Sequence, residues 1–223
     1  MLAAEFENAL AAIKDSNEID ALVITGAGSC FSAGLDLKSL PTYSREEQQS
    51  MVTQVNRLFG RLYGMPIPTV AAVNGHAIAG GLILTLACDC RLGAEGDYKL
   101  SLAEVRVGVP YPVAAMAIVQ SELTHPVARN LVLTGRNLDP REAMSRGILD
   151  ELHKLELLLP RSLEVARELA ALPHSIYGRI KRQLRSAALA RIDDAISNHG
   201  EPMLESWLSE ETLAASSEAL KRN

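Results

Sequence analysis

Apolar residues recur at helical and then at strand spacing along the first third of the chain. Residues 2–15 and 45–63 carry apolar side chains three and four positions apart, which predicts two amphipathic helices. Residues 21–26 and 68–75 are short, continuous runs of β-branched and small apolar residues, which predict buried strands. Residues 26–34, rich in Gly and Ser, predict a loop. Strands that alternate with helices in this way indicate an α/β core.

The pattern continues to about residue 155 and then changes. A helix opens at Ala79-Gly80-Gly81, and strands are predicted at residues 88–94, 98–102 and 148–152. Helices are predicted at residues 112–122 and 126–134, and another begins at Asp139-Pro140 and stops at Gly147. From residue 156 onward Leu, Ala, Arg and Glu dominate and strand patterns stop. We therefore expect a core over residues 1–155 and a helical segment over residues 156–223.

Composition and charge exclude several classes of protein. The chain has 223 residues, 48% of them hydrophobic and 22% charged, which is typical of a globular domain with a sizeable core. A net charge of −5 gives no basic footprint for nucleic acid. No apolar stretch is long enough to span a bilayer, and the N-terminus lacks the pattern of a signal peptide. We expect neither nucleic acid nor a membrane as a partner.

The cysteines and histidines give no metal-binding pattern. Cys30, Cys88 and Cys90 are an odd number without a second ligand pair, so we expect no metal site and a reducing, cytoplasmic compartment. Cys88 and Cys90 are interpreted as small buried thiols on one face of a strand. The five histidines are scattered, and only His76, in the small-residue stretch before a predicted helix, is kept as a candidate functional residue.

The first glycine-rich stretch does not match a dinucleotide-binding fingerprint. In "VITGAGSCFSAG" the strand runs into Gly26 and Gly28, but the third glycine of the fingerprint is replaced by Phe31. A phosphate-binding lysine is also absent from the stretch. Two glycines alone are a common loop device, and the dinucleotide interpretation is set aside.

The stretch "NGHAIAGGLILTLACDC", residues 74–90, is more informative. A helix that begins at these small residues leaves its first N–H groups unpaired at the positive end of its dipole. Glycine removes side-chain bulk there, so a carbonyl oxygen can reach the Gly80 amide. Close packing of the helix on a strand is the alternative explanation for the same glycines at this point. The loop at Ser32-Ala33-Gly34 follows the other predicted strand, so the two loops are predicted to meet at the carboxyl edge of a parallel sheet.

Four stretches carry a resemblance that covers nearly the whole chain. They are "CFSAGLDL", "PTVAAVNGHAIAGGLILTLACD", "LSLAEVRVGVP" and "LVLTGRNLDPREAMSRGILDEL". Together they resemble the crotonase superfamily, the enoyl-CoA hydratase/isomerase family. The resemblance implies an α/β fold built as a spiral of ββα units, with a C-terminal helical segment through which members form homotrimers or hexamers. Members usually begin with a β-hairpin before the first helix, and we expect this chain to lack that hairpin.

The resemblance also implies how the chain would bind its substrate. The amides of Leu35 and Gly80 would form an oxyanion hole for the thioester oxygen of an acyl-CoA. To share one oxygen at hydrogen-bond distance, the two nitrogens must lie within about 6 Å of each other. Together with Gly80, residues of the first loop would also bind coenzyme A along its path: Ala33, Leu35, Asp36, Leu37 and Lys38. Coenzyme A would enter as part of the substrate, and no permanently bound cofactor is expected.

The acid–base residues implied by the resemblance separate the possible reactions. Hydratases of the family use two glutamates, and here the first position is Ile83 whereas the second is Glu104. One base is enough to shift a double bond from 3-enoyl-CoA to 2-enoyl-CoA through a dienolate, and an apolar pocket that contains Ile83 would raise the pKa of Glu104. Tyr111 follows "GVP", as in some decarboxylases of the family. Hydration, decarboxylation and a catalytically weak acyl-CoA-binding protein are the alternatives.

Overall fold

Two parallel sheets form the centre of the computed structural model, which describes residues 2–16, 18–36, 38–39, 42–197, 201–202, 204–207 and 209–221. The four-stranded sheet has the order β1 (Leu22–Thr25), β3 (Thr69–Val73), β5 (Cys90–Ala94) and β7 (Glu151–His153). The three-stranded sheet has the order β2 (Cys30–Ser32), β4 (His76–Ile78) and β6 (Leu100–Ser101). Each pairing between neighbouring strands is parallel.

The chain builds these sheets by repeating one ββα unit. Each unit gives its first strand to the four-stranded sheet and its second strand to the three-stranded sheet, and then forms a helix. The helices of the three units are α2 (Arg45–Tyr63), α3 (Gly80–Ala87) and α4 (Glu104–Val107). This arrangement confirms the predicted spiral. The sequence did not predict β2 and β4, because strands of three residues are too short to show a hydrophobic period.

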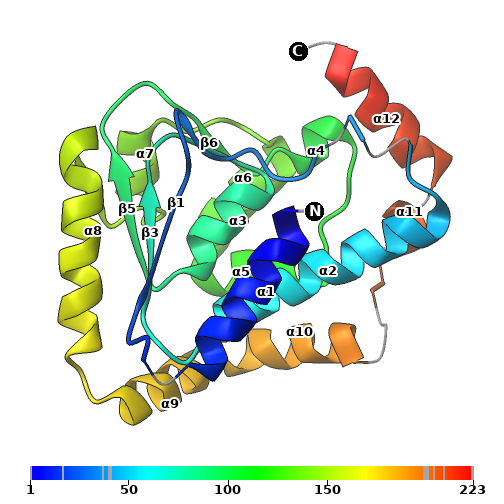
Figure 1. Ribbon diagram of the computed structural model, residues 1–223. Coiled ribbons are helices and arrows are strands. Elements are labelled where there is room, and N and C mark those ends of the chain that lie inside the picture. Colours follow the sequence, from blue (N-terminus) through cyan, green and yellow to red (C-terminus); the bar gives the residue numbers. More distant parts are fainter. Residues whose placement is uncertain are drawn as a thin grey trace.

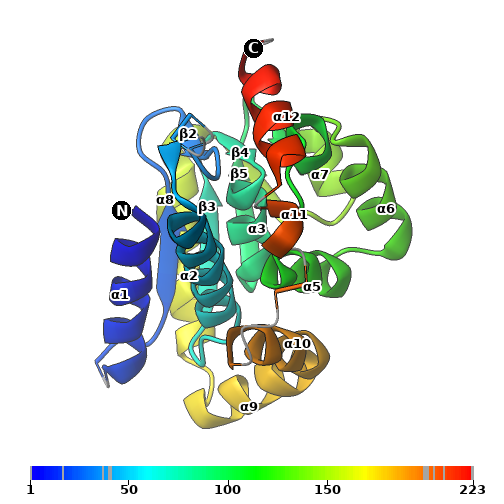
Figure 2. The ribbon, with the colours of Figure 1, turned by 90° about the vertical axis from the view of Figure 1, so that its right-hand side faces the viewer.

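Helices enclose the sheets on both sides (Figure 1). Helix α8 (Leu155–Ala170) packs on all four strands of the larger sheet, and α2 packs on α1 (Leu2–Asp15), α3 and α5 (Val113–Glu122). The remaining helices are α6 (His125–Thr134), α7 (Pro140–Ser145), α9 (His174–Leu184), α10 (Ser186–Ser197), α11 (Leu204–Trp207) and α12 (Glu210–Lys221). Figure 2 shows α9 and α10 at the bottom of the molecule and α11 and α12 above them.

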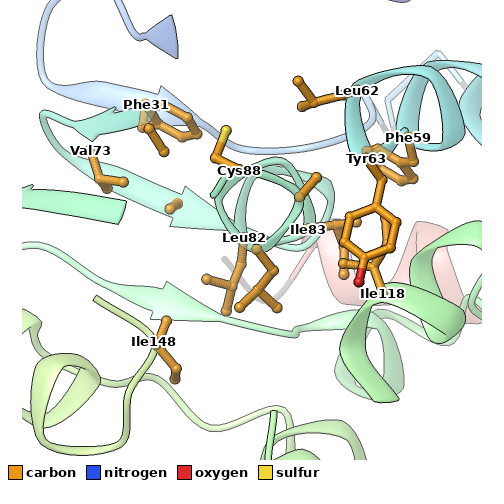
Figure 3. Close-up of a cluster of buried hydrophobic side chains, with 14 of the residues drawn as sticks. Phe31, Phe59, Leu62, Tyr63, Val73, Leu82, Ile83, Cys88, Ile118 and Ile148 are labelled. Carbon is orange, nitrogen blue, oxygen red and sulfur yellow. The ribbon is translucent and has the colours of Figure 1, made fainter. Parts of the chain in front are cut away.

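Helix α3 is apolar on every side because other elements surround it. It contacts α2, α5 and the strands β2, β3 and β4. Leu82, Ile83 and Leu86 have no exposed surface at all. Figure 3 shows Leu82 and Ile83 among the core side chains, with Tyr63 of α2 and Ile118 of α5 in the same cluster. The purely aliphatic turn of the sequence is therefore the middle of the core.

Two predicted strands begin later than expected. The last strand was predicted at residues 148–152 but comprises Glu151–His153, because the amides of Ile148 and Leu149 both donate to the carbonyl of Ala143 and close the turn after α7. Similarly, the strand predicted from residue 88 begins at Cys90. Cys88 therefore caps α3 and does not share a strand face with Cys90, which corrects that interpretation of the two thiols.

The described residues contain neither a membrane-spanning helix nor a metal-binding cluster. None of the described helices is both long enough and apolar enough to cross a membrane. Within the same residues, His, Cys, Asp and Glu side chains do not gather into a group of three that would suit a metal ion.

Candidate active site

The candidate residues follow the carboxyl ends of the three strands of the smaller sheet. Leu35 comes shortly after β2, Gly80 directly after β4, and Glu104 shortly after β6. Because β4 lies between β2 and β6, and strands in a sheet are about 4.8 Å apart, the three segments lie side by side at one edge. The sequence predicted this edge but assigned it to the strands that form the larger sheet.

The backbone at the start of α3 is held in an unusual conformation. Ala79 has φ 52° and ψ −120°, and it is the one residue other than glycine with a positive φ in the described part of the chain. Its amide donates to the carbonyl of Ser101 at 2.8 Å, and its own carbonyl accepts from Leu82 and Ile83. The helix then begins at Gly80, as predicted. The Gly80 amide has no hydrogen-bond acceptor among the described residues.

The first loop touches this helix start directly. Gly34 has φ 81°, and a Cβ atom placed on it would lie 2.9 Å from the Gly80 nitrogen. The next residue, Leu35, also has an amide without an acceptor in the described part of the chain. The amides of Leu35 and Gly80 are therefore two unpaired donors in the described part of the chain, and they lie on either side of the contact between Gly34 and the Gly80 nitrogen. That both bind the same oxygen stays a prediction.

The glycines of this helix start have different roles. A Cβ atom on Gly81 would lie 2.0 Å from the carbonyl oxygen of Ser32, so this glycine allows strand and helix to pack closely. At Gly80 the nearest atom to such a Cβ is the Cα of Gly34 at 3.3 Å. Close packing therefore explains Gly81, whereas the accessible amide expected at Gly80 stays a prediction.

Asn74 fixes the loop that leads to the site. Its Oδ1 accepts from the amide of Gly26 at 2.9 Å, and its Nδ2 donates to the carbonyl of Gly28 at 2.9 Å. His76, kept as a candidate from the sequence, lies in β4, where its Nδ1 accepts from the amide of Lys99 at 3.1 Å. His76 thus links the start of β4 to the segment just before β6. Sequence reasoning missed the part that Asn74 plays, although it stands directly before the glycine of the turn.

Glu104 is the first residue of α4 and is only 7% exposed. Burial raises the pKa of its carboxyl group above the usual value, and its own backbone amide and Tyr111 partly offset the shift. Burial and the nearby Glu104 also raise the pKa of the Tyr111 phenol. The two side chains are thus close enough to interact, but Glu104 Oε2 and Tyr111 Oη are buried without a partner in hydrogen-bond geometry among the described residues. A buried carboxyl with a raised pKa is suited to exchanging protons.

The predicted coenzyme-binding residues of the first loop are exposed where the structure describes them, except Leu35, which is half-buried. Ala33, Asp36 and Lys38 lie at the surface, whereas Leu37 lies outside the described residues. Asp36 accepts from the amide of Lys38 and from the hydroxyl of Ser39, and these hydrogen bonds, that of Ser39 first, hold its pKa below the usual value. Asp36 therefore shapes the turn of the loop.

One buried side chain near the site was not predicted. Trp207 of α11 forms a cluster with Val52 and Val109, and Leu35 packs against this cluster. The available signal was that Trp207 is the only tryptophan of the chain and stands in a segment that otherwise reads as an ordinary helix.

Comparison with known proteins agrees with this geometry. A family model described as Enoyl-CoA hydratase/isomerase matches residues 1–221. The enoyl-CoA hydratase EchA3 from Mycobacterium ulcerans Agy99 is similar in structure, with a TM-score of 0.83 and 30% identity over 93% of this chain and 88% of that one. Human mitochondrial delta3-delta2-enoyl-CoA isomerase superposes with a TM-score of 0.91 and 25% identity over 99% of this chain and 86% of that one.

Curated relatives are matched over part of their length. The chain is 37% identical over 155 residues to a protein of Thermus thermophilus, an alignment that spans 68% of this chain and 60% of that protein. It is 30% identical over 148 residues to the enoyl-CoA isomerase/hydratase fer4 of Mycosarcoma maydis, which spans 66% of this chain and 54% of that protein.

Proposed function

Because the chain belongs to the enoyl-CoA hydratase/isomerase family, we propose that it converts a 3-enoyl-CoA into the 2-enoyl-CoA with Glu104 as its base. The observation that carries this proposal is the single carboxylate. Glu104 is the one buried acidic residue in the described part of the chain, and Ile83, where a hydratase has its other glutamate, is an alkyl side chain with no exposed surface.

The reaction needs one proton carrier and one oxyanion hole. The Glu104 carboxylate removes a proton from C2, and the electron pair passes into the thioester to form a dienolate with its negative charge on the oxygen. The amides of Leu35 and Gly80 donate to that oxygen, and each such donor is worth about 3–4 kcal/mol in the transition state. The protonated Glu104 then returns the proton to C4, which leaves the double bond between C2 and C3. Nothing is added or lost overall.

The environment of Glu104 favours this transfer over the addition of water. A raised pKa stabilises the protonated form that must deliver the proton to C4. Hydration needs a second group that holds and activates a water molecule, and the isoleucine at position 83 offers no hydrogen bond. Hydration therefore remains the second candidate, supported by the similarity to EchA3.

Decarboxylation and silent binding are further alternatives with one observation each. The buried, unpartnered Tyr111 Oη beside Glu104 is the group on which an acyl-CoA decarboxylase would rely. The burial of Glu104 would suit an acyl-CoA-binding protein with little activity if the substrate did not reach the carboxylate. In all four cases the thioester is held by the Leu35 and Gly80 amides, and coenzyme A extends along the loop from Ala33 to Lys38.

A panel of substrates tests these possibilities. We would incubate the protein with 2-enoyl, 3-enoyl and malonyl-type CoA thioesters and follow the products by chromatography. The proposal expects turnover of 3-enoyl-CoA above all others, and a loss of about 10²–10⁴ in rate for Glu104→Gln with unchanged binding of coenzyme A thioesters. Near-normal rates in Glu104→Gln together with lost rates in Tyr111→Phe would overturn it in favour of decarboxylase chemistry. Binding without any turnover would favour the silent binder.

We also propose that the chain acts as a homotrimer or hexamer in the cytoplasm. Ile176, Ile180 and Leu184 form a stripe along α9, 48%, 58% and 80% exposed respectively, which a second copy of the chain would cover. The three free cysteines support a reducing compartment.

A further inference from the structure

Residues 201–221, which we call the C-terminal segment, reach the candidate active site at three separate points. Trp207 lies near Leu35, Ala215 lies against Gly108, and Glu201 binds the amide of Val113. Figure 1 shows α11 next to the end of α2 and α12 beside α4, on the opposite flank of the molecule from α8. The C-terminal segment therefore packs on elements that adjoin the residues proposed to carry out the reaction.

The first contact joins the two halves of the site. Trp207 is 1% exposed and shares a buried cluster with Val52 and Val109, and Leu35 packs against the same cluster. Leu35 carries one of the oxyanion amides. The amide of Val109 donates to the carbonyl of Glu104 at 3.1 Å, so the position of Val109 is tied to that of the base. Trp207 thus belongs to a buried cluster that includes Val109 of the turn carrying Glu104, and Leu35 of the oxyanion loop packs against that cluster.

The second contact fixes the start of the C-terminal segment. Glu201 Oε2 accepts from Asn56 Nδ2 at 2.8 Å and from the amide of Val113 at 3.0 Å. Asn56, which is 2% exposed, accepts from the amide of Ala114 at 2.9 Å. These two side chains satisfy the first amides of α5, a helix that follows directly on Tyr111 and has no side-chain cap of its own. The segment is therefore anchored beside Tyr111.

The third contact places α12 on the end of α4. Gly108 has φ 71°, and a Cβ atom there would lie 2.3 Å from the Cβ of Ala215. The same glycine donates its amide to the carbonyl of Glu104 and so ends α4. The C-terminal segment is thus docked at Glu201 and at Ala215, and α11 with Trp207 lies between these two attachments.

We propose that Trp207 is a positioning residue, which holds the oxyanion loop and the Glu104 turn in register through the Leu35 and Val109 side chains. This inference rests on the proposed function, since it concerns the same site. The indole N–H of Trp207 has no hydrogen-bond partner among the described residues, so packing alone accounts for its place. Its shape and volume should therefore matter, and its N–H should not.

Two substitutions at this position separate positioning from mere stability. Trp207→Ala removes the packed ring and is expected to lower kcat for 3-enoyl-CoA by about 10–100-fold while KM changes by less than about threefold, because small displacements of reacting groups have effects of this size. Trp207→Phe keeps a packed ring and should stay within about threefold of the wild type. The matched control is Glu205→Ala. Glu205 lies on α11 like Trp207, is exposed and pairs with Arg45 of α2, so this variant should leave kcat and KM unchanged.

Fluorescence provides a readout that does not depend on turnover. Since Trp207 is the only tryptophan of the chain, intrinsic emission reports this position alone. Titration with butyryl-CoA, which has no double bond to move, should change the emission saturably, with the same midpoint as binding measured by equilibrium dialysis. A merely structural tryptophan would not respond to the ligand.

The outcomes are distinguishable from failure of the proposed function. Butyryl-CoA binding without a change in emission, or a folded Trp207→Ala variant with kcat within twofold of the wild type, would overturn the role of Trp207 and leave the isomerase proposal intact. A loss in Trp207→Phe as large as that in Trp207→Ala would contradict packing as its basis. Absence of both thioester binding and turnover would overturn the proposed function and this inference together.

Discussion

Gly28 lies between β1 and β2 and Gly34 lies between β2 and α2, and both have a left-handed backbone, with φ 66° and 81°. Their surroundings differ completely. A Cβ atom on Gly28 would meet nothing within 4 Å, whereas one on Gly34 would lie 2.9 Å from the Gly80 nitrogen. At Gly34 the missing side chain therefore keeps a backbone donor open, and at Gly28 it serves only the turn.

This pair gives a controlled test of the oxyanion hole. Gly34→Ala should lower kcat/KM by about 10²–10³-fold, because the new methyl group covers the Gly80 amide and one oxyanion donor is worth that much. Gly28→Ala carries the same backbone penalty without the obstruction and should change kcat/KM by less than about threefold. Steady-state kinetics with 3-enoyl-CoA would measure both. Equal losses in the two variants would mean that loop strain, and not the covered amide, is responsible.

The raised pKa of Glu104 predicts a pH-dependent effect on stability. Burial makes the native state bind a proton more tightly than the unfolded chain, so stability falls as the pH rises through the raised pKa. Glu104→Gln removes this penalty and should raise the Tm at pH 8, by about 2–4 °C for each kcal/mol relieved. The gain should vanish below about pH 4, where glutamate is protonated even when unfolded.

Thermal unfolding followed by circular dichroism across this pH range would check the effect. Glu95→Gln, at an exposed position, is the control and should leave the Tm unchanged at every pH. A Tm for Glu104→Gln that stays equal to or below the wild-type Tm at pH 8 would show that the native state stabilises the ionised carboxylate.

At this scale the sequence predicted the positions of the candidate residues more fully than their backbone conformations. Glu104, Ile83, Gly80 and Leu35 were predicted from motif positions, and the structure places three of them after neighbouring strands and Ile83 in the core. The positive φ of Ala79 was not predictable, because alanine has no preference for that region and only the surrounding hydrogen bonds impose it.

At the scale of elements, the two ends of α3 differ in whether their backbone groups have hydrogen-bond partners. The Gly80 end is left open, whereas the other end is closed by Arg185, which is 4% exposed. The Arg185 guanidinium donates to the carbonyls of Tyr63 at 3.0 Å and of Ala87 and Cys88 at 3.4 Å. It also pairs with Asp89 at 3.0 Å and lies 4.1 Å from the centre of the Tyr63 ring. Arg185 thus ties the junction of α9 and α10 to the C-terminal end of α3.

Removing this guanidinium should be strongly destabilising. Arg185→Gln leaves Asp89 with one fewer buried partner and several carbonyls unsatisfied, and loss of one member of a buried pair is worth about 3–5 kcal/mol. Urea denaturation would measure the change in the free energy of unfolding. Arg182→Ala, at an exposed position on α9 three residues before Arg185, should stay within about 0.5 kcal/mol of the wild type. A similar small change for Arg185→Gln would mean that the network contributes little.

The elements themselves were predictable where their period was long. Helices α1 and α2 and the strands β1 and β3 appear within a residue or two of the predicted bounds. Strands β2 and β4 were missed, since a three-residue strand in a parallel sheet is defined by its neighbours and not by its own pattern. These strands position the candidate site, so sequence reasoning named the candidate residues without the sheet that aligns them.

At the scale of the whole molecule, the exposed stripe on α9 predicts self-association. We expect the 24.1 kDa chain to give a trimeric or hexameric mass in light scattering at micromolar concentration. Ile180→Asp places a charge in the middle of the stripe and should shift the protein toward monomers. Leu133→Asp, at a residue 68% exposed on α6, is the control and should keep the wild-type mass. A monomeric wild-type protein would contradict the prediction.

The helical nature of residues beyond 156 was predictable from composition, but their destination was not. Helix α8 packs on the larger sheet, α10 packs on α2 and α5, and α12 packs on α4. Leu and Ala at helical spacing predict that one face of each helix is buried, but they do not indicate which element that face packs against. Only the assembled fold reveals that the end of the chain returns to the candidate site.

The complete burial of Ile83 has a consequence for how this protein can change over successive mutations. Adding the second glutamate of a hydratase is a one-residue change, but at this position it would put an unpaired charge among Tyr63, Ile118 and other core side chains. An isolated buried carboxylate is penalised by several kcal/mol, a large part of the stability of an ordinary domain. The hydratase pair is therefore out of reach in one step. Neighbours on α2 and α5 would have to shrink first and admit water, so the history of this site depends on the order in which its core is remodelled.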